Sequence, residues 1–364
     1  MPKNWSECLT SFAMPLARRM PGAAKVLIVG MGDLGAQIAR IVVENRFSSS
    51  CLLAGNSPAA KQWAQLLHIV TGGDVEGLQV DALDTDALSK LLADYEPGLI
   101  IQCASLLSPF ALANRESDAA KAVLRGGFAL QASAQLPIIR NVMLARRSLG
   151  MTCPVVNCSY PDLTHPMLSA EGLSPTCGIG NVAILAMRFQ RLIAGAESAR
   201  LRVIGHHAQL IGSLLGEGPA PLVFLGDRQI PEDQLVRKTG LQSGSTLNYL
   251  AAATILPILT GLLRSKVVET HAPGVHGLPG GYPVRFEEGE IDLDLPGGMS
   301  RARSVQFNIE AAALEGIERV DESGTLFYSR DAQDAVAPWC PDLAEPLALG
   351  DVSKRFEILQ RLLR

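Results

Sequence analysis

The stretch Lys25-Val26-Leu27-Ile28-Val29-Gly30-Met31-Gly32-Asp33-Leu34-Gly35 decides how this chain begins to fold. Its apolar first part predicts a short buried strand, and the residues after Gly35 have the apolar periodicity of a helix. In the G-x-G-x-x-G turn between them, Gly30 allows the tight turn, Gly32 lets a pyrophosphate approach the backbone and Gly35 lets helix and strand pack closely. The helix N-terminus favours negative charge. The predicted dinucleotide-binding residues of this turn are Gly30, Gly32, Asp33, Leu34 and Gly35.

Strands and helices alternate from this stretch to about residue 160. Further strands are expected at 51–55, near 78–80, at 99–104 and at 154–157. Helices are expected at 58–69, 84–94, 118–125 and 137–149. Such alternation favours parallel strands joined by right-handed crossovers, with helices on both faces of one sheet. The predicted fold class is α/β, a doubly wound parallel (Rossmann) sheet that binds its ligand at the carboxyl ends of the strands.

The pattern changes beyond residue 160. Strand-like and helical segments are mixed there, at 182–194, 200–205, 243–264, 283–295, 300–315, 325–328 and 350–363. We therefore expect a mixed α+β substrate domain after the sheet. The predicted division is an N-terminal extension over 1–24, a dinucleotide-binding domain over 25–160 and a substrate, catalytic and oligomerisation domain over 161–364.

Composition limits the classes of function. The chain has 364 residues, of which 48% are hydrophobic and 19% charged, and its net charge is −4. This balance gives no electrostatic footprint for nucleic acid or for an anionic membrane. No apolar run is expected to span a bilayer, since the longest, Leu247–Leu263, is interrupted by polar residues and predicts a buried helix. We expect a small-molecule substrate, neither a nucleic-acid nor a membrane partner, and a homo-oligomer that is a dimer or a tetramer.

The cysteines and the N-terminus bear on the compartment. The seven cysteines show neither C-x-x-C nor Cys/His ligand spacing, which favours reduced thiols over a metal site or a disulfide framework. The N-terminus carries Lys3, Asn4 and Glu7 and has no continuous apolar core, so no secretory signal is expected. These features predict a cytoplasmic protein without a metal.

The end of the second predicted strand bears on which nicotinamide cofactor binds. In dinucleotide sites an acid there bonds the ribose hydroxyls and repels a 2′-phosphate. Here the strand ends in Asn56-Ser57, with Lys61 shortly after and no acid. An amide, a hydroxyl and an ammonium suit the extra phosphate of NADP, so NADP is preferred to NAD. Alternatively, Asn56 and Ser57 only N-cap the following helix. Ala104, at the end of the fourth predicted strand, completes the predicted cofactor site.

Polar groups end two predicted strands of the later part. Residues 157–165 follow one strand, and Val203-Ile204-Gly205-His206-His207 closes another on two histidines. A histidine at a strand's carboxyl end can deliver the proton that accompanies a hydride, although a core histidine satisfied by backbone bonds is the alternative. Adjacent histidines on a strand point to opposite faces and seldom ligate one ion. A metal site is therefore not expected.

The order of these segments resembles the lactate/malate dehydrogenase superfamily over most of residues 25–330. The resemblance rests on Gly30–Gly35, on Asn157 with Asp162-Leu163-Thr164 (similar to N-P-x-D-x-x-T), on Val203–His207 (similar to V-x-G-E-H-G-D) and on Gly244-Ser245-Thr246 (similar to K-G-A-T). The first part is equally similar to NADP-binding domains of the saccharopine dehydrogenase type. The resemblance implies a Rossmann domain, a nicotinamide cofactor and dehydrogenase or reductase activity.

Carried over by position, the resemblance also implies site residues. His207 falls on the catalytic acid/base, Asn157 on the asparagine that bonds the reacting oxygen, and Thr246 on the threonine of the substrate pocket. The family's orienting aspartate and its substrate-binding arginine fall on Ala183 and Ala186. The histidine thereby loses its orienting aspartate. The site also loses the arginine guanidinium, which recognises a planar carboxylate through two hydrogen bonds. A substrate other than plain lactate or malate is therefore expected.

Other side chains are candidates for these roles. Asp162 is the candidate for the orienting carboxylate. Tyr160, His165 and Tyr282 are further candidate donors, although a tyrosine in a turn, as Tyr282 is, more often packs. Arg115 falls where the family keeps a mobile arginine over the active site, and a solvated loop arginine is an equal alternative.

The sequence thus predicts an NAD(P)-dependent oxidoreductase. It would transfer a hydride to a C=O or C=N bond of a small substrate, of which an amino-acid-derived molecule is one candidate, with His207 as proton donor. One alternative is a non-redox lyase or synthase that uses tightly bound NAD(P) transiently. Another is a catalytically inactive cofactor-binding homologue, with which Ala183 and Ala186 are consistent.

Overall fold

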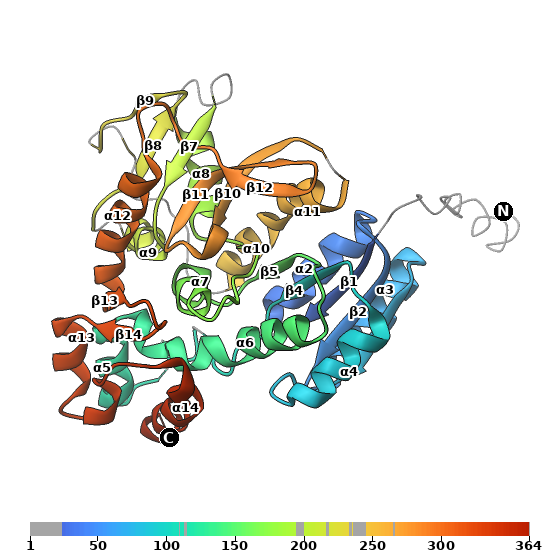
Figure 1. Cartoon of the computed structure of the whole chain (residues 1–364), viewed down its shortest axis with the longest axis horizontal. Coiled ribbons are helices and arrows are strands. Elements are labelled where there is room, and N and C mark those ends of the chain that lie inside the picture. The colour runs from blue at the N-terminus through green and yellow to red at the C-terminus, as the bar shows by residue number, and fades with distance from the viewer. Residues whose placement is uncertain are drawn as a thin grey trace, which may run out of the picture.

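The computed structural model describes residues 24–108, 110–112, 115–193, 200–215, 218–232, 235, 245–264 and 266–363. Residues 1–23 of the expected extension and Gly244 of the last matched motif lie outside these ranges. The central sheet lies on one side of the molecule, and the three smaller sheets lie on the other (Figure 1).

The central sheet is the element that the first stretch of sequence predicts. Its strands are all parallel and follow the order β3-β2-β1-β4-β5-β6. They are β1 (Ala24–Val29), β2 (Ser48–Gly55), β3 (Val75–Gln79), β4 (Leu99–Gln102), β5 (Val155–Asn157) and β6 (Cys177–Gly178). The order reverses between β1 and β4, the point at which open α/β sheets bind ligands. The predicted fold class is confirmed, and the sheet continues past the expected domain boundary at residue 160.

The continuous apolar run of β1 is explained by burial on both faces of the sheet. Leu27 and Val29 pack into one core, whereas Val26 and Ile28 pack into the other. Successive strand residues point to opposite faces, so a strand with helices on both sides has no polar face. Because β1 lies between β2 and β4, the turn that follows it opens at the middle of the sheet's carboxyl edge.

Helices of the predicted kind connect these strands. They are α2 (Asp33–Glu44), α3 (Ala59–Thr71), α4 (Thr85–Tyr95), α5 (Asp118–Gly126) and α6 (Ala132–Ser148). α4 begins where the Asp84 carboxylate accepts from the N–H groups of Asp86 and Ala87. α6 begins before its predicted start at Pro137, since burial of the residues around that proline outweighs the one hydrogen bond it cannot donate.

Beyond residue 160 the chain forms small antiparallel sheets and further helices, as predicted. The sheets are β7 (Leu201–Ile204), β8 (Leu222–Leu225) and β9 (Arg228–Gln229); β10 (Val268–Pro273), β11 (Gly281–Glu287) and β12 (Glu290–Leu293); and β13 (Ile317–Val320) with β14 (Leu326–Tyr328). The helices include α7 (Pro161–Ser169), α8 (Val182–Leu192), α9 (His207–Leu215), α12 (Arg301–Ala312), α13 (Arg330–Val336) and α14 (Val352–Leu362). An isolated bridge between Gly205 and Gly281 joins the first two sheets.

The long apolar helix expected over 243–264 is interrupted. α10 (Ser245–Ala253) and α11 (Ile255–Arg264) meet at Thr254. By length and composition alone, Thr246–Arg264 could nevertheless cross a membrane, so the polar residues in this run do not exclude a span, contrary to expectation. In the fold 39% of that stretch is buried, and its helices pack against α2, α8 and β10.

The end of the chain returns to the central sheet. α13 packs against α5, and α14 packs against α6. The apolar core on that side of the sheet contains Val29 of β1 together with Val336 and Leu359. The C-terminal segments therefore complete the domain that the first stretch begins.

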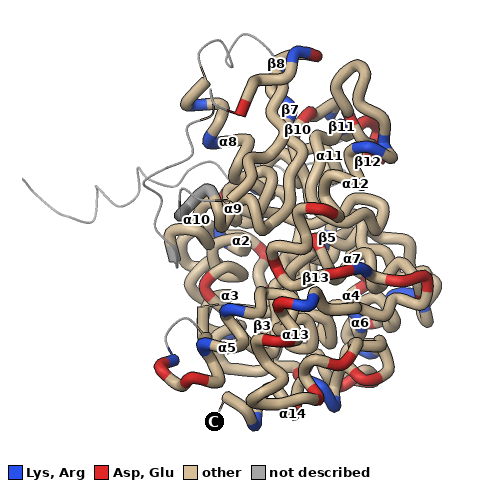
Figure 2. Tube along the Cα trace, turned by 90° about the vertical axis from the view of Figure 1, so that its left-hand side faces the viewer, with Lys and Arg blue, Asp and Glu red and all other residues tan. Residues whose placement is uncertain are grey.

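Charges are distributed without a dominant sign. Over the described part of the trace, Figure 2 shows positive and negative residues interspersed, with neither forming a continuous band on the visible side. This distribution agrees with the small net charge of −4. It provides little field to attract a polyanion.

Candidate functional site

The glycine turn has the geometry that its sequence predicts. Gly30 has a φ of +100°, and a Cβ there would lie 2.5 Å from the nitrogen of Ala104. A Cβ on Gly35 would collide with the carbonyl oxygen of Gly30. These two positions therefore require glycine so that β1, α2 and the end of β4 can pack. A Cβ on Gly32, in contrast, would meet nothing within 4 Å, so space remains at the position predicted for the pyrophosphate.

Helix α2 begins at this turn without a side-chain cap. Gly32 is its N-cap residue, and no side chain bonds its first N–H groups. The carboxylate of Asp33 is held by Gln37 Nε2 at 3.1 Å and by Asn248 Nδ2 of α10 at 2.8 Å. Leu34 packs partly buried against the neighbouring core. Uncapped N–H groups carry partial positive charge, so the turn suits a phosphate group.

Asn56, Ser57 and Lys61 lie exposed beyond β2. The alternative in which Asn56 and Ser57 cap the next helix is wrong, because Pro58 is the N-cap residue of α3 and no side chain caps it. Proline fixes φ near the helical value and starts the helix without such a bond. The Asn56 carbonyl accepts from Gln79 Nε2 at 3.2 Å. The amide, the hydroxyl and the ammonium therefore remain accessible to a ligand.

The imidazole of His207 is held by a carboxylate that the sequence did not indicate. His207 Nδ1 bonds Glu315 Oε1, and the Tyr160 hydroxyl donates to Glu315 Oε2 at 2.5 Å. Glu315 is 5% exposed, whereas 20% of the His207 side chain is exposed. No described residue bonds Nε2 of His207. The ring is thus fixed through one nitrogen and presents the other, as an acid–base histidine requires.

Glu315 reaches this position from a late segment of the chain. It ends the 3₁₀ turn Ala313–Glu315 that follows α12. Its backbone packs so closely on the chain at Gly127, whose φ is +101°, that a Cβ there would collide with the Glu315 carbonyl. One sequence signal could have found Glu315: an acid at the end of a predicted helix opposes the helix dipole and needs another reason to be there.

The His207–Glu315 pair shifts both titrations toward the charged forms. Burial alone would lower the pKa of His207, but the charge and hydrogen bond of Glu315, with the charge of Asp162, outweigh it and raise that pKa. Burial alone would raise the pKa of Glu315, but the charge and hydrogen bond of His207 outweigh it and lower that pKa. His207 therefore keeps its proton to higher pH than it would without Glu315, and the ring is able to release that proton to a bound atom.

Aromatic rings lie beside the imidazole. The ring centroid of Phe128 is 5.3 Å from that of His207 and 4.4 Å from that of Tyr160. Tyr160 is buried at the start of α7, and burial, followed by the charge of Glu315, raises the pKa of its hydroxyl well above its usual value. The Tyr160 hydroxyl therefore stays protonated and donates a hydrogen bond to Glu315. This disfavours the alternative in which Tyr160 protonates a substrate.

Asp162 binds the backbone of His207, and not its ring. One carboxylate oxygen accepts from the His207 N–H at 2.9 Å, and the other accepts from Asn181 Nδ2. Asp162 lies in the first turn of α7, directly after β5, so this bond ties the start of α9 to the carboxyl edge of the central sheet. The hypothesis that Asp162 orients the imidazole is corrected, because Glu315 occupies that position.

Asn157 lies at the same edge of the sheet but is enclosed. Its Nδ2 is 3.1 Å from each of the Ser159 carbonyl oxygen, the Thr164 hydroxyl and His165 Nε2, and its Oδ1 accepts from the Ser159 N–H at 3.0 Å. These bonds fix the turn from β5 into α7. A contact between Asn157 and the reacting oxygen stays a prediction, since a substrate would have to displace one of them.

His206 and His207 lie beyond the strand, and not on its opposite faces. β7 ends at Ile204, and His207 begins α9. The buried ring of His206 approaches the same carboxylate, with its Nδ1 3.6 Å from Glu315 Oε2. The expectation of opposite faces is therefore wrong, because strand alternation stops before the two histidines. In the part of the chain that the structure describes, no group of three His, Cys, Asp or Glu side chains is placed to hold a metal ion.

The remaining candidates are engaged elsewhere or untested. His165 is fully buried against a backbone carbonyl, and burial lowers its pKa to about 4. The Tyr282 hydroxyl donates to a backbone carbonyl at 2.6 Å, as expected of a packing residue. Arg115 donates to the carbonyl of Leu363 beyond α14, which neither of its two interpretations anticipated. Thr246 is exposed on α10, and its place beside the substrate stays a prediction.

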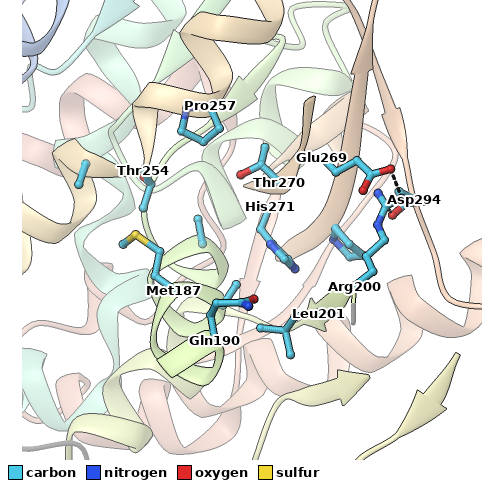
Figure 3. A pocket seen from close by; sticks show the side chains of 14 residues that line it. Met187, Gln190, Arg200, Leu201, Thr254, Pro257, Glu269, Thr270, His271 and Asp294 are labelled. Carbon is cyan, nitrogen blue, oxygen red and sulfur yellow. Dashed lines mark hydrogen bonds and ion pairs between the residues drawn. The ribbon is translucent and has the colours of Figure 1, made fainter. Parts of the chain in front are cut away.

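Ala183 and Ala186 line a separate cavity. It has a volume of about 540 Å³ and contains neither His207 nor Glu315. Figure 3 shows Arg200 on one wall, where it forms ion pairs with Glu269 and Asp294. The positions matched to the family's aspartate and arginine thus carry no group that could orient His207, and Glu315 of another segment bonds the ring.

Comparison with known proteins supports the fold. No protein-family model and no curated protein matches the sequence. The structure is similar to that of the malate dehydrogenase from Aeropyrum pernix, with a TM-score of 0.50, 12% sequence identity and coverage of 88% of this chain and 100% of that chain. At this identity the likeness shows the fold alone. The chain therefore has the lactate/malate dehydrogenase fold, as its sequence resemblance implied.

Two further solved structures are similar at a slightly lower level. One is a lactate dehydrogenase enzyme from a Medee basin deep-sea metagenome library, with a TM-score of 0.49, 14% identity and coverage of 86% of this chain and 99% of that chain. The other is a minor L-lactate dehydrogenase from Enterococcus mundtii, with a TM-score of 0.49, 15% identity and coverage of 82% and 100%.

Proposed function

We propose that this protein is an NAD(P)-dependent oxidoreductase that reduces a C=O or C=N bond, with His207 as the proton donor. The observation that carries the proposal is the His207–Glu315 pair, in which a buried carboxylate holds one ring nitrogen and leaves the other without a described partner. Asp162 anchors the start of α9 at the sheet edge where the glycine turn lies. A proton donor and a dinucleotide turn at one edge are the parts that such a reduction needs.

The glycine turn and the end of β2 would hold the cofactor. The uncapped N–H groups of α2 face the open space at Gly32 and would bind the pyrophosphate. We propose NADP as the cofactor, because Asn56, Ser57 and Lys61 are exposed where a 2′-phosphate would lie and no acid opposes it. Bound there, the nicotinamide supplies hydride chemistry.

His207 would supply the proton that completes the reduction. In its charged form the ring donates from Nδ1 to Glu315 and from Nε2 to the substrate oxygen or nitrogen. As negative charge develops on that atom, the proton moves from Nε2 and the ring becomes neutral while its bond to Glu315 persists. Phe128 and Tyr160 lie beside the ring and would restrict the access of water to that side of it.

The substrate is proposed to differ from lactate and malate. At the positions matched to the family's substrate-binding arginine and its neighbour, this chain has small apolar side chains. A carbonyl or imine on a larger, amino-acid-derived molecule is therefore the first class to test. Net loss of nicotinamide absorbance with such compounds supports the proposal. Cofactor retained through purification without net turnover favours the non-redox alternative, and binding with no turnover favours the inactive homologue.

We also propose a cytoplasmic homo-oligomer. Helix α3 presents Leu66, Ile69 and Val70 with exposed fractions of 47%, 71% and 64%, and their spacing places them on one helix face. Such a patch on an otherwise mixed surface suits a second copy of the chain, and two-fold dimers are the commonest closed assembly. Sedimentation velocity tests this, and Ile69→Glu should shift a dimer toward monomer. A monomer for the unaltered chain contradicts it.

A further inference from the structure

Two cysteines lie in contact at the carboxyl edge of the central sheet. Cys103 and Cys158 directly follow the paired strands β4 and β5, whose last residues are in register. Their Sγ atoms are 3.5 Å apart. Both residues are free thiols and half-buried. Among the described cysteines they form the thiol pair that the scattered sequence positions did not reveal.

The two sulfurs lie close enough for a disulfide to form. Neighbouring strands lie about 4.8 Å apart, within the range of Cα separations of about 4.4–6.8 Å that disulfides span. The two sulfurs would have to approach by only about 1.4 Å to reach a bond length of about 2.05 Å. Side-chain rotation supplies much of that distance, so the bond can form without unpairing the strands.

Cys103 lies directly beneath the glycine turn. Its N–H donates to the carbonyl of Val29 at 2.7 Å. A Cβ placed on Gly35 would lie 3.4 Å from the Cβ of Cys103. The next residue, Ala104, lies so close to Gly30 that a side chain at that position would collide with it. A shift of Cys103 would therefore change the contacts that shape the predicted pyrophosphate site.

We propose that Cys103 and Cys158 form a reversible disulfide that weakens dinucleotide binding at the glycine turn. The oxidant class is a peroxide. The Cys103 thiol loses its proton, the resulting thiolate attacks one peroxide oxygen, and the O–O bond breaks. The products are a sulfenic acid and a hydroxide, which takes up the released proton to form one water. The Cys158 sulfur then attacks the Cys103 sulfur, the S–S bond forms, and the departing hydroxide takes the thiol proton as a second water. The effect on binding rests on the proposed function, whereas disulfide formation does not.

The two sulfurs differ in their expected order of reaction. Burial raises the pKa of the Cys158 thiol well above its usual value, which slows its ionisation. Cys103 is therefore assigned the first attack and Cys158 the second. A thiol reductant reverses the reaction by thiol–disulfide exchange.

Mass spectrometry of the full chain tests the bond itself. The protein is treated with hydrogen peroxide, with or without later dithiothreitol, and its free thiols are then alkylated and its peptides mapped. We expect a cross-linked peptide joining Cys103 and Cys158 that dithiothreitol removes. Cys158→Ser should abolish the cross-link, while Cys153→Ser, at another half-buried cysteine, should leave it unchanged. Absence of the Cys103–Cys158 cross-link after full oxidation overturns the proposal.

Fluorescence titration with NADPH tests the consequence for binding. The oxidised protein should bind several-fold more weakly than the reduced protein, and dithiothreitol should restore the affinity. Cys158→Ser should keep its affinity through the same treatment. A cross-linked protein with unchanged affinity overturns the link to the nucleotide site. If the reduced protein binds neither NADPH nor NADH, the proposed function fails, and the peptide map still decides whether the thiol pair closes.

Discussion

The two parts of the proposed site differ in how the chain assembles them. The glycine turn is local, because Gly30, Gly32 and Gly35 lie within one strand-to-helix connection. The proton donor is assembled at long range, because His207 is held by Glu315, 108 residues further along. A turn that binds phosphate needs particular backbone angles at consecutive positions. An orienting carboxylate only has to reach one point in space, so any segment can supply it.

The largest expected effect is the loss of dinucleotide binding when the glycine turn, the local part of the site, is altered. Gly32→Val should abolish binding of NADPH and NADH, because the branched side chain would occupy the space left for the pyrophosphate. The fold should survive, since a Cβ at Gly32 meets nothing within 4 Å and its φ of −78° suits any residue. Fluorescence titration measures the binding, and the melting temperature reports the fold.

Gly350→Val is the matched control for that change. Gly350 also has open space around its missing Cβ and lies far along the chain in another turn. It should bind the dinucleotide like the unaltered protein. A folded Gly32→Val protein with unchanged affinity would refute the assignment of the glycine turn as the cofactor site.

The contrast between the two parts explains what the sequence could predict. The doubly wound parallel sheet and the tasks of Gly30 and Gly35 follow from neighbouring residues, and the structure confirms them. The cap of α3 was not predictable in the same way, because Pro58 and the polar pair before it both suit a helix start. The partner of His207 depends on how the chain after α12 packs on Gly127, a tertiary contact without a local pattern.

The next largest effect is a loss of turnover when His207, in the part assembled at long range, is replaced. His207→Asn should lower turnover by about 10²–10⁴-fold, the usual contribution of general acid–base catalysis. Dinucleotide affinity should change little, because the imidazole does not contribute to the glycine turn. Steady-state kinetics and fluorescence titration separate the two outcomes.

His206→Asn is the internal comparison for that change. His206 approaches the same carboxylate at 3.6 Å but is fully buried, so it should affect turnover much less than His207. A larger loss from His206 would make it the acid instead. If neither variant slows turnover, the proton must come from elsewhere and the assignment of the pair fails.

A smaller effect sharpens the role of Glu315 as a positioning residue. Glu315→Gln keeps a hydrogen-bond acceptor for His207 Nδ1 but removes the charge that raises the pKa of His207. Reduction requires the protonated ring, so it should decline as pH rises through that pKa. In the variant this decline should move to lower pH, because burial then dominates the pKa of the ring. An unshifted pH profile of kcat would assign Glu315 a structural role only.

Glu315→Gln should also change how the stability of the fold depends on pH. The raised pKa of His207 contributes stability below its unfolded value of 6.5, which is lost as pH rises through the folded pKa. The lowered pKa of Glu315 contributes stability above its unfolded value of 4.5, which is lost as pH falls through the folded pKa. The melting temperatures of the unaltered protein and Glu315→Gln should therefore differ most between pH 4.5 and 6.5. A difference independent of pH would contradict the charged pair.

The smallest expected effect is a change in the preference for NADP over NAD, which differ by one phosphate. It concerns the residues that follow β2. Gly55→Asp with Lys61→Ala should shift preference from NADP toward NAD, since an acid repels the 2′-phosphate and bonds the ribose while an ion pair is lost. A Cβ at Gly55 would have only ordinary contacts, the nearest 3.6 Å away, so the fold should tolerate it. A charged hydrogen bond contributes about 1.5–3 kcal/mol, which corresponds to roughly 10–100-fold in NADP affinity.

Gly55→Asn with Lys61→Ala is the uncharged control, and its change in cofactor preference should be only the part due to Lys61. If the unaltered protein already prefers NAD, the polar residues after β2 do not bind a phosphate, and the proposal of NADP falls while the glycine turn stands.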